Sequence, residues 1–411
     1  MQKIGRKGSA KLMILCAAAY FTSYLTRMNF AAVLAAIIQA DDIDKTLAGA
    51  VTTLGFITYG AGQLVSGWLG DRINPKKLMF GGFLLTAAMN MMISVCPNGR
   101  WMCLVWAVNG FAQAFMWPPM VKIMKNAMDD DGYNKGVLVV NLGATFATVM
   151  IYLISPFIIR QWSWRAVFRI NGTAAVVMAV VWMIVITEIE KTANLTYVLI
   201  KGKTQKKEKG SLSVNVGLLA VVMLAIMLQG SLRDGVTTWV PTYITEVFKL
   251  DSSNSILTSV VIPVFSFISL KVSSVIYNKT GKKPYKLAGI FFAAAALCAV
   301  ILRIFSDVTP ILTVALAALL VAIMHGVNLI LVCFLPAILA GENNMSVLSG
   351  MLNFTTYVGS AVSTYGFAVF SEKTGWSGTV TLWAVIAVLG AVMCVFGGKI
   401  NQNLDKKVKM C

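Results

Sequence analysis

Three basic side chains and one acidic side chain lie well inside apolar stretches of this sequence: Arg27, Arg233, Lys271 and Asp234. A charged side chain at the centre of a membrane helix costs about 2.5–3.5 kcal/mol on insertion scales, so each of them needs a partner. Asp234 follows Arg233 directly and, at about 100° per residue on a helix, should point away from it. The cations therefore outnumber the carboxylate, and an anion from outside the protein is the simplest remaining partner.

The two arginines have the chemistry to bind such an anion. A guanidinium group is planar and permanently charged, and it donates two parallel hydrogen bonds to a phosphate or a carboxylate. Other partners remain open, because each arginine could instead pair with Asp234, bond backbone carbonyls or extend to the membrane surface. Lys271 lies only about two turns from the cytoplasmic end of its expected span, which favours extension to the surface.

Aromatic and amide side chains at helical spacing complete a candidate binding set. Tyr20, Tyr24 and Arg27 recur at spacings of four and three, which places them on one helix face. Two prolines directly after Trp117 should bend or break their helix, because proline lacks a backbone N–H. Packing or interface anchoring stays the alternative for every aromatic residue. The other members of the set are Tyr59, Gln63, Trp117, His325, Asn328, Asn353 and Tyr357.

The composition places these residues in an integral membrane protein. The chain has 411 residues, 57% hydrophobic and 13% charged, where an average soluble domain has about 25% charged residues. A cytosolic enzyme, a secreted disulfide scaffold and a disordered chain are excluded. The seven cysteines are scattered without a CxxC pair, so neither a disulfide framework nor a metal site is expected, and no cofactor is implied.

Apolar runs separated by glycine, proline, asparagine and charged residues predict an all-α protein with twelve membrane-spanning helices. Pro241 falls inside the seventh span and could break it. The first run is long and has no small-residue cleavage site, so it should be retained as a span. The expected spans are 11–38, 46–70, 78–96, 100–126, 134–158, 164–187, 213–248, 253–277, 284–305, 309–339, 343–370 and 376–398.

The distribution of lysine and arginine predicts the orientation. The N-terminus and the even-numbered loops hold 24 of these residues and the odd-numbered loops hold 8. Because basic loops stay in the cytoplasm, both termini and a basic linker at 188–212 should be cytoplasmic. The linker would separate a bundle of six helices at 1–187 from a second at 213–411, the latter ending in a short cytoplasmic tail.

The two halves resemble each other. Arg27 and Arg233 are 206 positions apart, and the basic loops around Asp71 and Asn278 are 207 positions apart. Such a repeat predicts two pseudo-symmetric bundles with the substrate site between them near the bilayer midplane. The first of these loops combines small residues that permit close helix approach with charges that could pair across a cytoplasmic gap. Its candidate gating residues are Gly67, Gly70, Asp71, Arg72, Lys76 and Lys77; a plain solvated turn is the alternative.

Segment 67–77 resembles the cytoplasmic loop signature of the major facilitator superfamily, and the twelve-span pattern extends that resemblance over the whole chain. Within the superfamily, the sequence is similar to the organophosphate:phosphate antiporters, the bacterial glycerol-phosphate and hexose-phosphate carriers. The stretches 20–30, 109–119, 232–243 and 353–359 carry the likeness. The resemblance implies rocker-switch exchange of a phosphorylated metabolite for inorganic phosphate, with Arg27 and Arg233 matching the two phosphate-binding arginines.

The sequence also departs from the better-known members of that family. Met28 stands where a lysine is common, Thr238 where the matching acid is expected and Gln63 where a lysine is frequent. A family histidine falls at Val140, beside Asn141, which joins the candidate binding set, and a family tyrosine falls at His325. These changes bear on the substrate: a sugar phosphate, a phosphoglycerate-like acid and a non-phosphorylated organic anion all remain open.

The resulting hypothesis is a monomeric inner-membrane transporter whose partners are a small organic anion, inorganic phosphate and lipid, and not nucleic acid. One rival is a proton- or sodium-coupled symporter of an organic acid such as a sugar acid, for which Asp234 and His325 are the coupling candidates. A membrane-embedded enzyme would need a nucleophile–base pair or a metal cluster, for which the sequence offers one histidine and no HExxH. A sensor with the same fold would bind the anion without moving it.

Overall fold

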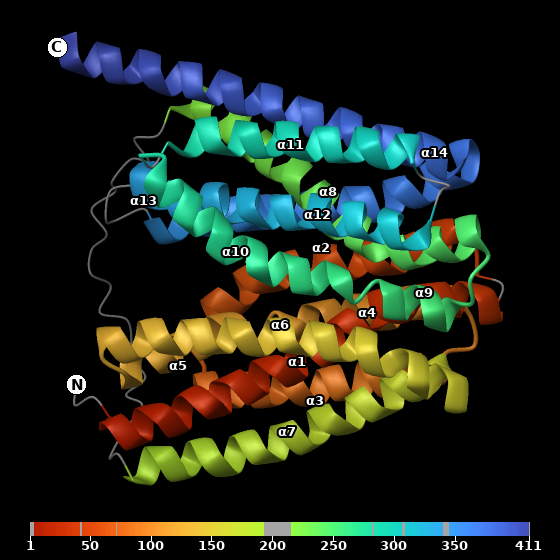
Figure 1. The fold of residues 1–411 in the computed structure, drawn as a ribbon. Coiled ribbons are helices and arrows are strands. Elements are labelled where there is room, and N and C mark those ends of the chain that lie inside the picture. Colours follow the sequence, from red (N-terminus) through yellow and green to blue (C-terminus); the bar gives the residue numbers. More distant parts are fainter. Residues whose placement is uncertain are drawn as a thin grey trace. The chain divides into compact units, whose positions relative to one another are not determined.

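The computed structural model describes residues 4–41, 43–70, 72–192, 215–281, 283–305, 309–339 and 345–410. All regular secondary structure in these residues is helical, as expected (Figure 1). The chain divides into two compact units, residues 1–43 with 54–206 and residues 44–53 with 207–411. Each unit is considered by itself below.

The first unit is a bundle in which α1 packs against α6 and α7, and α3 packs against α7 and α4. Side-chain caps start several of these helices. Asn74 accepts a hydrogen bond from the backbone N–H of Lys76, and Asp129 accepts one from that of Gly132. The helices are α1 (Arg6–Asp41), α2 (Lys45–Gly70), α3 (Pro75–Ile93), α4 (Gly99–Gln113), α5 (Trp117–Ala127), α6 (Asp130–Gln161) and α7 (Trp164–Thr192).

The second unit is built around a long contact between its first and last helices, α8 and α14, with α11 against α14 and α10 against α12. Asn215 caps the start of α8 through the backbone N–H of Leu218. The elements are α8 (Val216–Phe248), α9 (Ser252–Thr258), α10 (Val261–Lys279), α11 (Pro284–Ile304), α12 (Pro310–Asn328), the π-helix η1 (Leu329–Phe334), α13 (Leu335–Leu339) and α14 (Met345–Met410).

Each of the twelve expected spans overlaps a helix, but the breaks differ from expectation. The fourth span is divided into α4 and α5 at Trp117, as the two prolines predict. In contrast, α8 runs through Pro241 to Phe248, so the suggested break there is wrong. The indole N–H of Trp239 donates to the Thr364 carbonyl at 2.9 Å, and such packing on α14 holds the helix through the proline.

Other interruptions have no counterpart in the sequence prediction. The eighth span is divided into α9 and α10 shortly before Pro263, which has no backbone N–H to donate to the Ser259 carbonyl; that carbonyl accepts from the N–H of Ile262 at 3.1 Å instead. The tenth span passes through the π-helix η1. By contrast, the expected break between the last two spans is present: the element α14 comprises two helices that meet at Gly375, whose φ of 73° is not helical. Of the expected linker, residues 188–192 belong to α7, and 193–212 lie outside the described residues.

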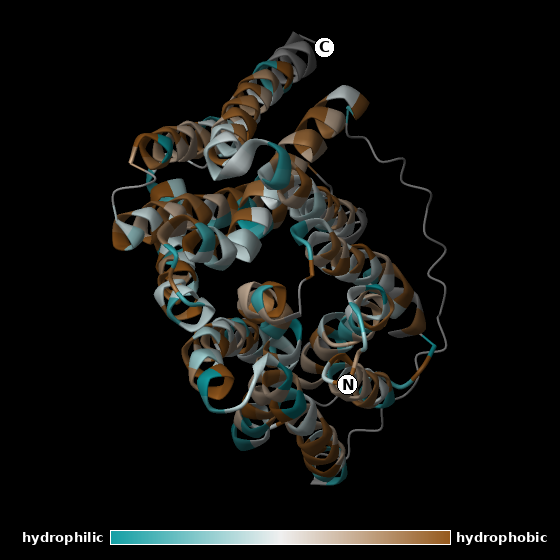
Figure 2. Ribbon diagram, turned by 90° about the vertical axis from the view of Figure 1, so that its right-hand side faces the viewer, coloured by the Kyte–Doolittle hydropathy of each residue, from teal (hydrophilic) through white to brown (hydrophobic). Residues whose placement is uncertain are grey.

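Among the described residues, eight stretches are both long and apolar enough to cross a membrane. Two expected spans, which meet at Gly375, fall together in Gly350–Gln402, and the break before Trp117 leaves α4 and α5 individually too short. The helices α2 and α3 are not among the eight stretches. Large apolar side chains such as Ile14 and Leu138 are 68% and 61% exposed, which is the surface that lipid requires. Figure 2 shows hydrophobic residues along the helices of both units.

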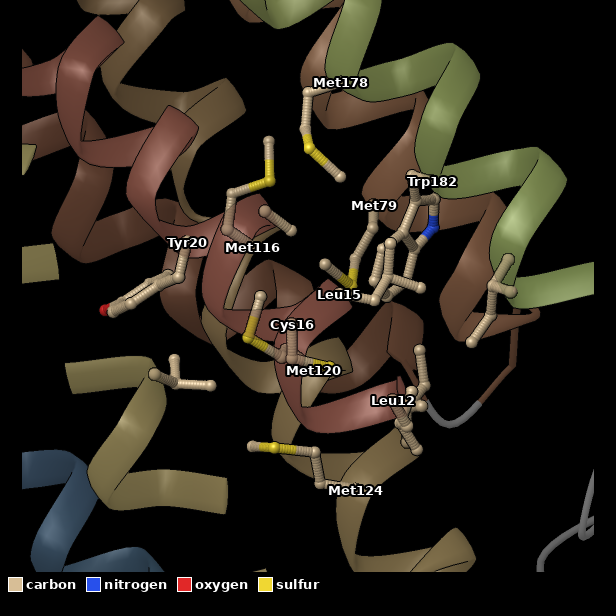
Figure 3. Packing of buried hydrophobic residues seen from close by; sticks show 14 of the residues in the cluster. Leu12, Leu15, Cys16, Tyr20, Met79, Met116, Met120, Met124, Met178 and Trp182 are labelled. Atoms are coloured by element: carbon tan, nitrogen blue, oxygen red, sulfur yellow. The ribbon is translucent and has the colours of Figure 1, made fainter. Parts of the chain in front are cut away.

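The core of the first unit is rich in methionine. Figure 3 shows Met79, Met116, Met120 and Met124 gathered around Cys16, with Trp182 beside them. Methionine is unbranched and fills irregular gaps between helices. This cluster joins α1, α3, α5 and α7, and it fixes the helix that carries Arg27.

Glycines at related positions bring helices together in both units. A Cβ added at Gly110 would overlap the backbone of Gly55 on α2, and one added at Gly326 would overlap Ser273 on α10. Gly110 and Gly326 are 216 positions apart. The same separation relates Gly143, which approaches α1, and Gly359, which approaches α8. These contacts extend the internal repeat suggested by the arginines.

The first turns of α2 pack in the second unit. The ammonium group of Lys45 lies 2.8 Å from the carboxylate of Glu246 and 5.3 Å from the ring centre of Trp376. The indole N–H of Trp376 donates to the same carboxylate at 2.7 Å. Further along α2, the hydroxyl of Thr53 donates to the Ala361 carbonyl at 2.8 Å. Residues 44–53 therefore belong with 207–411, a division that differs from the expected 1–187 and 213–411.

Candidate functional site

In the first unit, Arg27 lies among aromatic rings. Its guanidinium carbon is 3.8 Å from the ring centre of Tyr59 on α2 and 5.6 Å from that of Tyr24 on its own helix. A cation over an aromatic face is stabilised by about 0.5–2 kcal/mol, more as water is excluded. The contact with Tyr24 follows from the spacing of three residues, whereas that with Tyr59 depends on how α1 and α2 pack.

The aromatic group continues to the break in the fourth span. Tyr20 lies 5.0 Å from Tyr24 in an edge-on arrangement and 5.1 Å from Trp117, measured between ring centres. Trp117 is the first residue of α5, so the break that the prolines cause places its ring beside α1. Gln63 follows Tyr59 by one turn of α2 and is half-buried. The structure thus brings together the Tyr20, Tyr24, Arg27, Tyr59 and Trp117 predicted from sequence.

A buried network of amides and hydroxyls holds a neighbouring face of α1. Ser23 donates to the side-chain oxygen of Gln113 at 2.6 Å, and the Gln113 amide donates to the hydroxyl of Thr26 at 2.8 Å. Asn29 donates to Asn90 at 2.7 Å. In addition, the side chains of Asn90 and Asn109 donate to the Thr26 carbonyl, each at 3.3 Å.

These bonds join α1 to α3 and α4 and so set the rotation of α1, which directs Arg27 towards Tyr59. None of these hydrogen bonds was predicted from the sequence. Their signal was present as amide side chains inside apolar spans, which generally face other helices rather than lipid.

In the second unit, Arg233 is paired with its neighbour Asp234, which corrects the expectation that the two side chains diverge. The Nε and Nη2 atoms of Arg233 donate to the two carboxylate oxygens of Asp234 at 2.7 and 2.8 Å. Although successive Cβ atoms on a helix point about 100° apart, the arginine side chain is long enough to fold back to the carboxylate. Both side chains are largely buried, with exposures of 12% and 19%.

A third side chain completes this group. The hydroxyl of Ser360 on α14 donates to Asp234 Oδ2 at 2.5 Å. It reaches the carboxylate because α8 and α14 touch through their backbones: a Cβ at Gly230 would overlap Thr356, and one at Gly359 would overlap Met227. The group Arg233, Asp234 and Ser360 is called the Arg233 triad below.

Of the other predicted residues in the second unit, some lie near this triad and others do not. His325 on α12 is close enough to interact electrostatically with both Arg233 and Asp234. One turn later, the Asn328 amide donates to the side-chain oxygen of Gln229 at 3.3 Å, and the Gln229 amide donates to the Met324 carbonyl at 3.1 Å. Asn353 and Tyr357 are half-buried on α14, whereas Lys271 on α10 is exposed.

Two remaining predictions concern the first unit. Asn141 is exposed on α6, and its side-chain amide donates to the Val137 carbonyl of the same helix at 2.8 Å. Among the candidate gating residues, Lys76 forms a mostly buried ion pair with Glu190 at the end of α7. Lys77 and Arg72 are exposed, Gly67 and Gly70 end α2, and Asp71 lies outside the described residues.

Comparison with known proteins then decides the family. The model of the family described as Major Facilitator Superfamily matches residues 16–364. The chain belongs to this superfamily. It is therefore a multi-pass membrane transport protein and not an enzyme, and its helices form the all-α fold of the superfamily.

Individual relatives within the superfamily share moderate sequence identity with the chain. It is 22% identical to the glycerol-3-phosphate transporter of Bacillus subtilis (strain 168), over 87% of this chain and 85% of that protein. It is 24% identical to a probable hexose phosphate transport protein of Chlamydia muridarum, over 39% of this chain and only 35% of the relative. It is 25% identical to the membrane sensor protein UhpC of Salmonella typhimurium, over 38% of this chain and 36% of that protein.

Solved structures of the superfamily agree with the fold. A peptide transporter POT in complex with sulfate has a TM-score of 0.78 at 16% identity, covering 98% of this chain and 97% of the other. A bacterial homologue of the human lysosomal transporter Spinster has a TM-score of 0.76 at 15% identity, covering 96% of each chain. At such low identity the likeness concerns the fold alone.

Proposed function

We propose that this protein is a secondary active transporter of the inner membrane that exchanges a small organophosphate for inorganic phosphate. The observation that carries the proposal is one arginine inside an apolar span of each half, Arg27 and Arg233, at positions related by the internal repeat. The names of the relatives support a phosphorylated substrate, since they include a glycerol-3-phosphate transporter and a hexose phosphate transport protein.

In the proposed mechanism, the two guanidinium groups share the charge of one phosphate group. Each supplies paired N–H donors, and Tyr24 and Tyr59 limit the volume open to the ligand. Because the arginines belong to different halves, ligand binding would favour movement of one half against the other. This part of the proposal rests on the repeat and on the rocker-switch mechanism that the family resemblance implies. Segment 67–77 would stabilise the state closed to the cytoplasm, where both termini are proposed to lie.

Reconstituted vesicles test exchange directly. Purified protein in liposomes loaded with inorganic phosphate should take up labelled glycerol-3-phosphate or a hexose phosphate, and vesicles without internal phosphate should not. A pH gradient should leave this uptake unchanged. Uptake driven by a pH or sodium gradient without internal phosphate would replace exchange with symport, for which Asp234 and His325, close together in the second unit, are the coupling candidates.

A second candidate function is sensing, which the similarity to UhpC favours. A sensor would bind the organophosphate and fail to move it. A thermal-shift screen of phosphate esters and organic acids separates the cases when combined with the flux assay, because a ligand at 100 times its Kd adds about 2.7 kcal/mol of stability. A ligand that raises the melting temperature but is not exchanged in vesicles would establish the sensor instead.

A further inference from the structure

In the proposed function the guanidinium group of Arg233 binds the substrate, but in this structure the same group binds the carboxylate of Asp234. Its two oxygens take the Nε and Nη2 donors of Arg233, the same paired arrangement in which a guanidinium binds a phosphate or a ligand carboxylate. Both side chains are largely buried, so the carboxylate is a constant feature of the Arg233 surroundings. Any anion that binds Arg233 must therefore contend with an anion that is already present.

The triad also provides a partner for Asp234 when Arg233 turns to a ligand. A buried carboxylate that loses its only partner costs several kcal/mol. Here, however, the Ser360 hydroxyl donates to Oδ2 from the neighbouring helix, 2.5 Å away. Ser360 is held near Asp234 by the backbone contact of α8 with α14, and not by Arg233. The hydroxyl can therefore stay on the carboxylate while the guanidinium changes partner.

We propose that Asp234 is a resident anion on Arg233 that sets a charge threshold for ligands. A monocarboxylate offers Arg233 the same charge and the same paired oxygens as Asp234, so the exchange of partners gains little. A dianionic phosphate offers more charge and a third oxygen, and it can displace the carboxylate. After the ligand leaves, Asp234 returns to Arg233, which keeps ligand affinity low enough for release.

This inference rests on the proposed function and specifies the substrate class of that site. It also predicts opposite effects for two substitutions. Asp234→Asn removes the competing charge and should tighten binding of inorganic phosphate about tenfold, equivalent to about 1.4 kcal/mol, while it slows exchange because release is slower. The Ser360 hydroxyl bonds Asp234 in both states but more strongly once the guanidinium no longer shares the carboxylate's charge, so Ser360→Ala should weaken phosphate binding several-fold.

The experiment measures the Kd of inorganic phosphate and of acetate by titration calorimetry on purified full-length protein, with exchange rates in vesicles. Wild type should bind phosphate but not acetate, and Asp234→Asn should gain acetate binding. In the double variant, the Ser360→Ala change should have no further effect, because its role is exerted through Asp234. Asp251→Asn, an exposed carboxylate before α9, removes the same charge and should change neither ligand.

The outcomes are distinguishable from failure of the proposed function. If wild type binds neither phosphate nor phosphate esters, the proposed function fails and with it the inference. If wild type binds phosphate but Asp234→Asn weakens the binding or leaves it unchanged, Asp234 orients Arg233 and the inference alone is overturned. A Ser360→Ala effect that persists in the Asp234→Asn background also overturns it. Gel filtration and circular dichroism of each variant verify folding.

Discussion

The surroundings of Arg27 and Arg233 differ although the internal repeat relates the two positions. Arg27 lies over the ring of Tyr59 and beside Tyr24, and buried amides that bond a neighbouring face of its helix set its direction. Arg233 is instead bound by the carboxylate of Asp234, which a hydroxyl on α14 supports. A ring stabilises a cation without neutralising it, whereas a carboxylate neutralises it. On the proposed function, a ligand that binds Arg233 must displace a carboxylate, whereas a ligand that binds Arg27 meets the rings of Tyr24 and Tyr59.

The strongest test of this comparison is substitution of each arginine by lysine. Lysine keeps the charge but loses the paired donors, and hydrogen bonds to charged groups are worth about 1.5–3 kcal/mol. Arg27→Lys and Arg233→Lys should each lower phosphate-driven exchange about tenfold to a hundredfold in vesicles. Near-normal exchange in either variant would remove that arginine from the proposed site.

The next largest effect is expected where the backbones of α8 and α14 touch, beside the Arg233 triad. Gly359→Ala forces α14 away from the Met227 backbone, and overpacking of this kind costs about 1–3 kcal/mol. The melting temperature in detergent should fall clearly. Gly366→Ala on the same helix is the matched control, since nothing lies within 4 Å of its added methyl. Equal melting temperatures for the two variants would mean that the contact between α8 and α14 does not support the triad.

The amide network should matter for stability in the first half. Asn90→Leu removes the acceptor of the buried Asn29 amide N–H and the donor to the side-chain oxygen of Asn109, at a cost of about 1–3 kcal/mol. Thermal melting measures the effect. Asn141→Leu serves as the control for stability, because that amide is exposed and bonds only its own helix. A network of no structural importance would give the two variants the same melting temperature.

The smallest expected effect concerns the ring over which Arg27 lies. Tyr59→Leu removes the aromatic face and should weaken phosphate binding a few-fold, in keeping with about 0.5–2 kcal/mol for the cation–π contact. Tyr59→Phe keeps the face and should bind nearly as wild type does. If the phenylalanine variant is as weak as the leucine variant, the tyrosine hydroxyl and not the ring is responsible.

The sequence by itself determined the membrane class, the helical fold, the division of the fourth span and the two arginines. The length of an apolar run and the position of its flanking charges can be read from the local sequence, because the bilayer imposes the same requirements on every span. The face shared by Tyr24 and Arg27 also follows from sequence, since their spacing is fixed by the geometry of one helix.

Tertiary structure decided what each arginine contacts. Tyr59, Ser360 and the buried amides come from other helices, and their distance from α1 or α8 depends on the glycine contacts and on side-chain packing. Pro241 is tolerated for the same reason, whereas Arg233 reaches Asp234 because its long side chain folds back. Contacts with neighbouring helices and the choice of side-chain conformation contribute free energies as large as the local preferences of proline and of helix geometry. At these positions the contacts and conformations decide the structure.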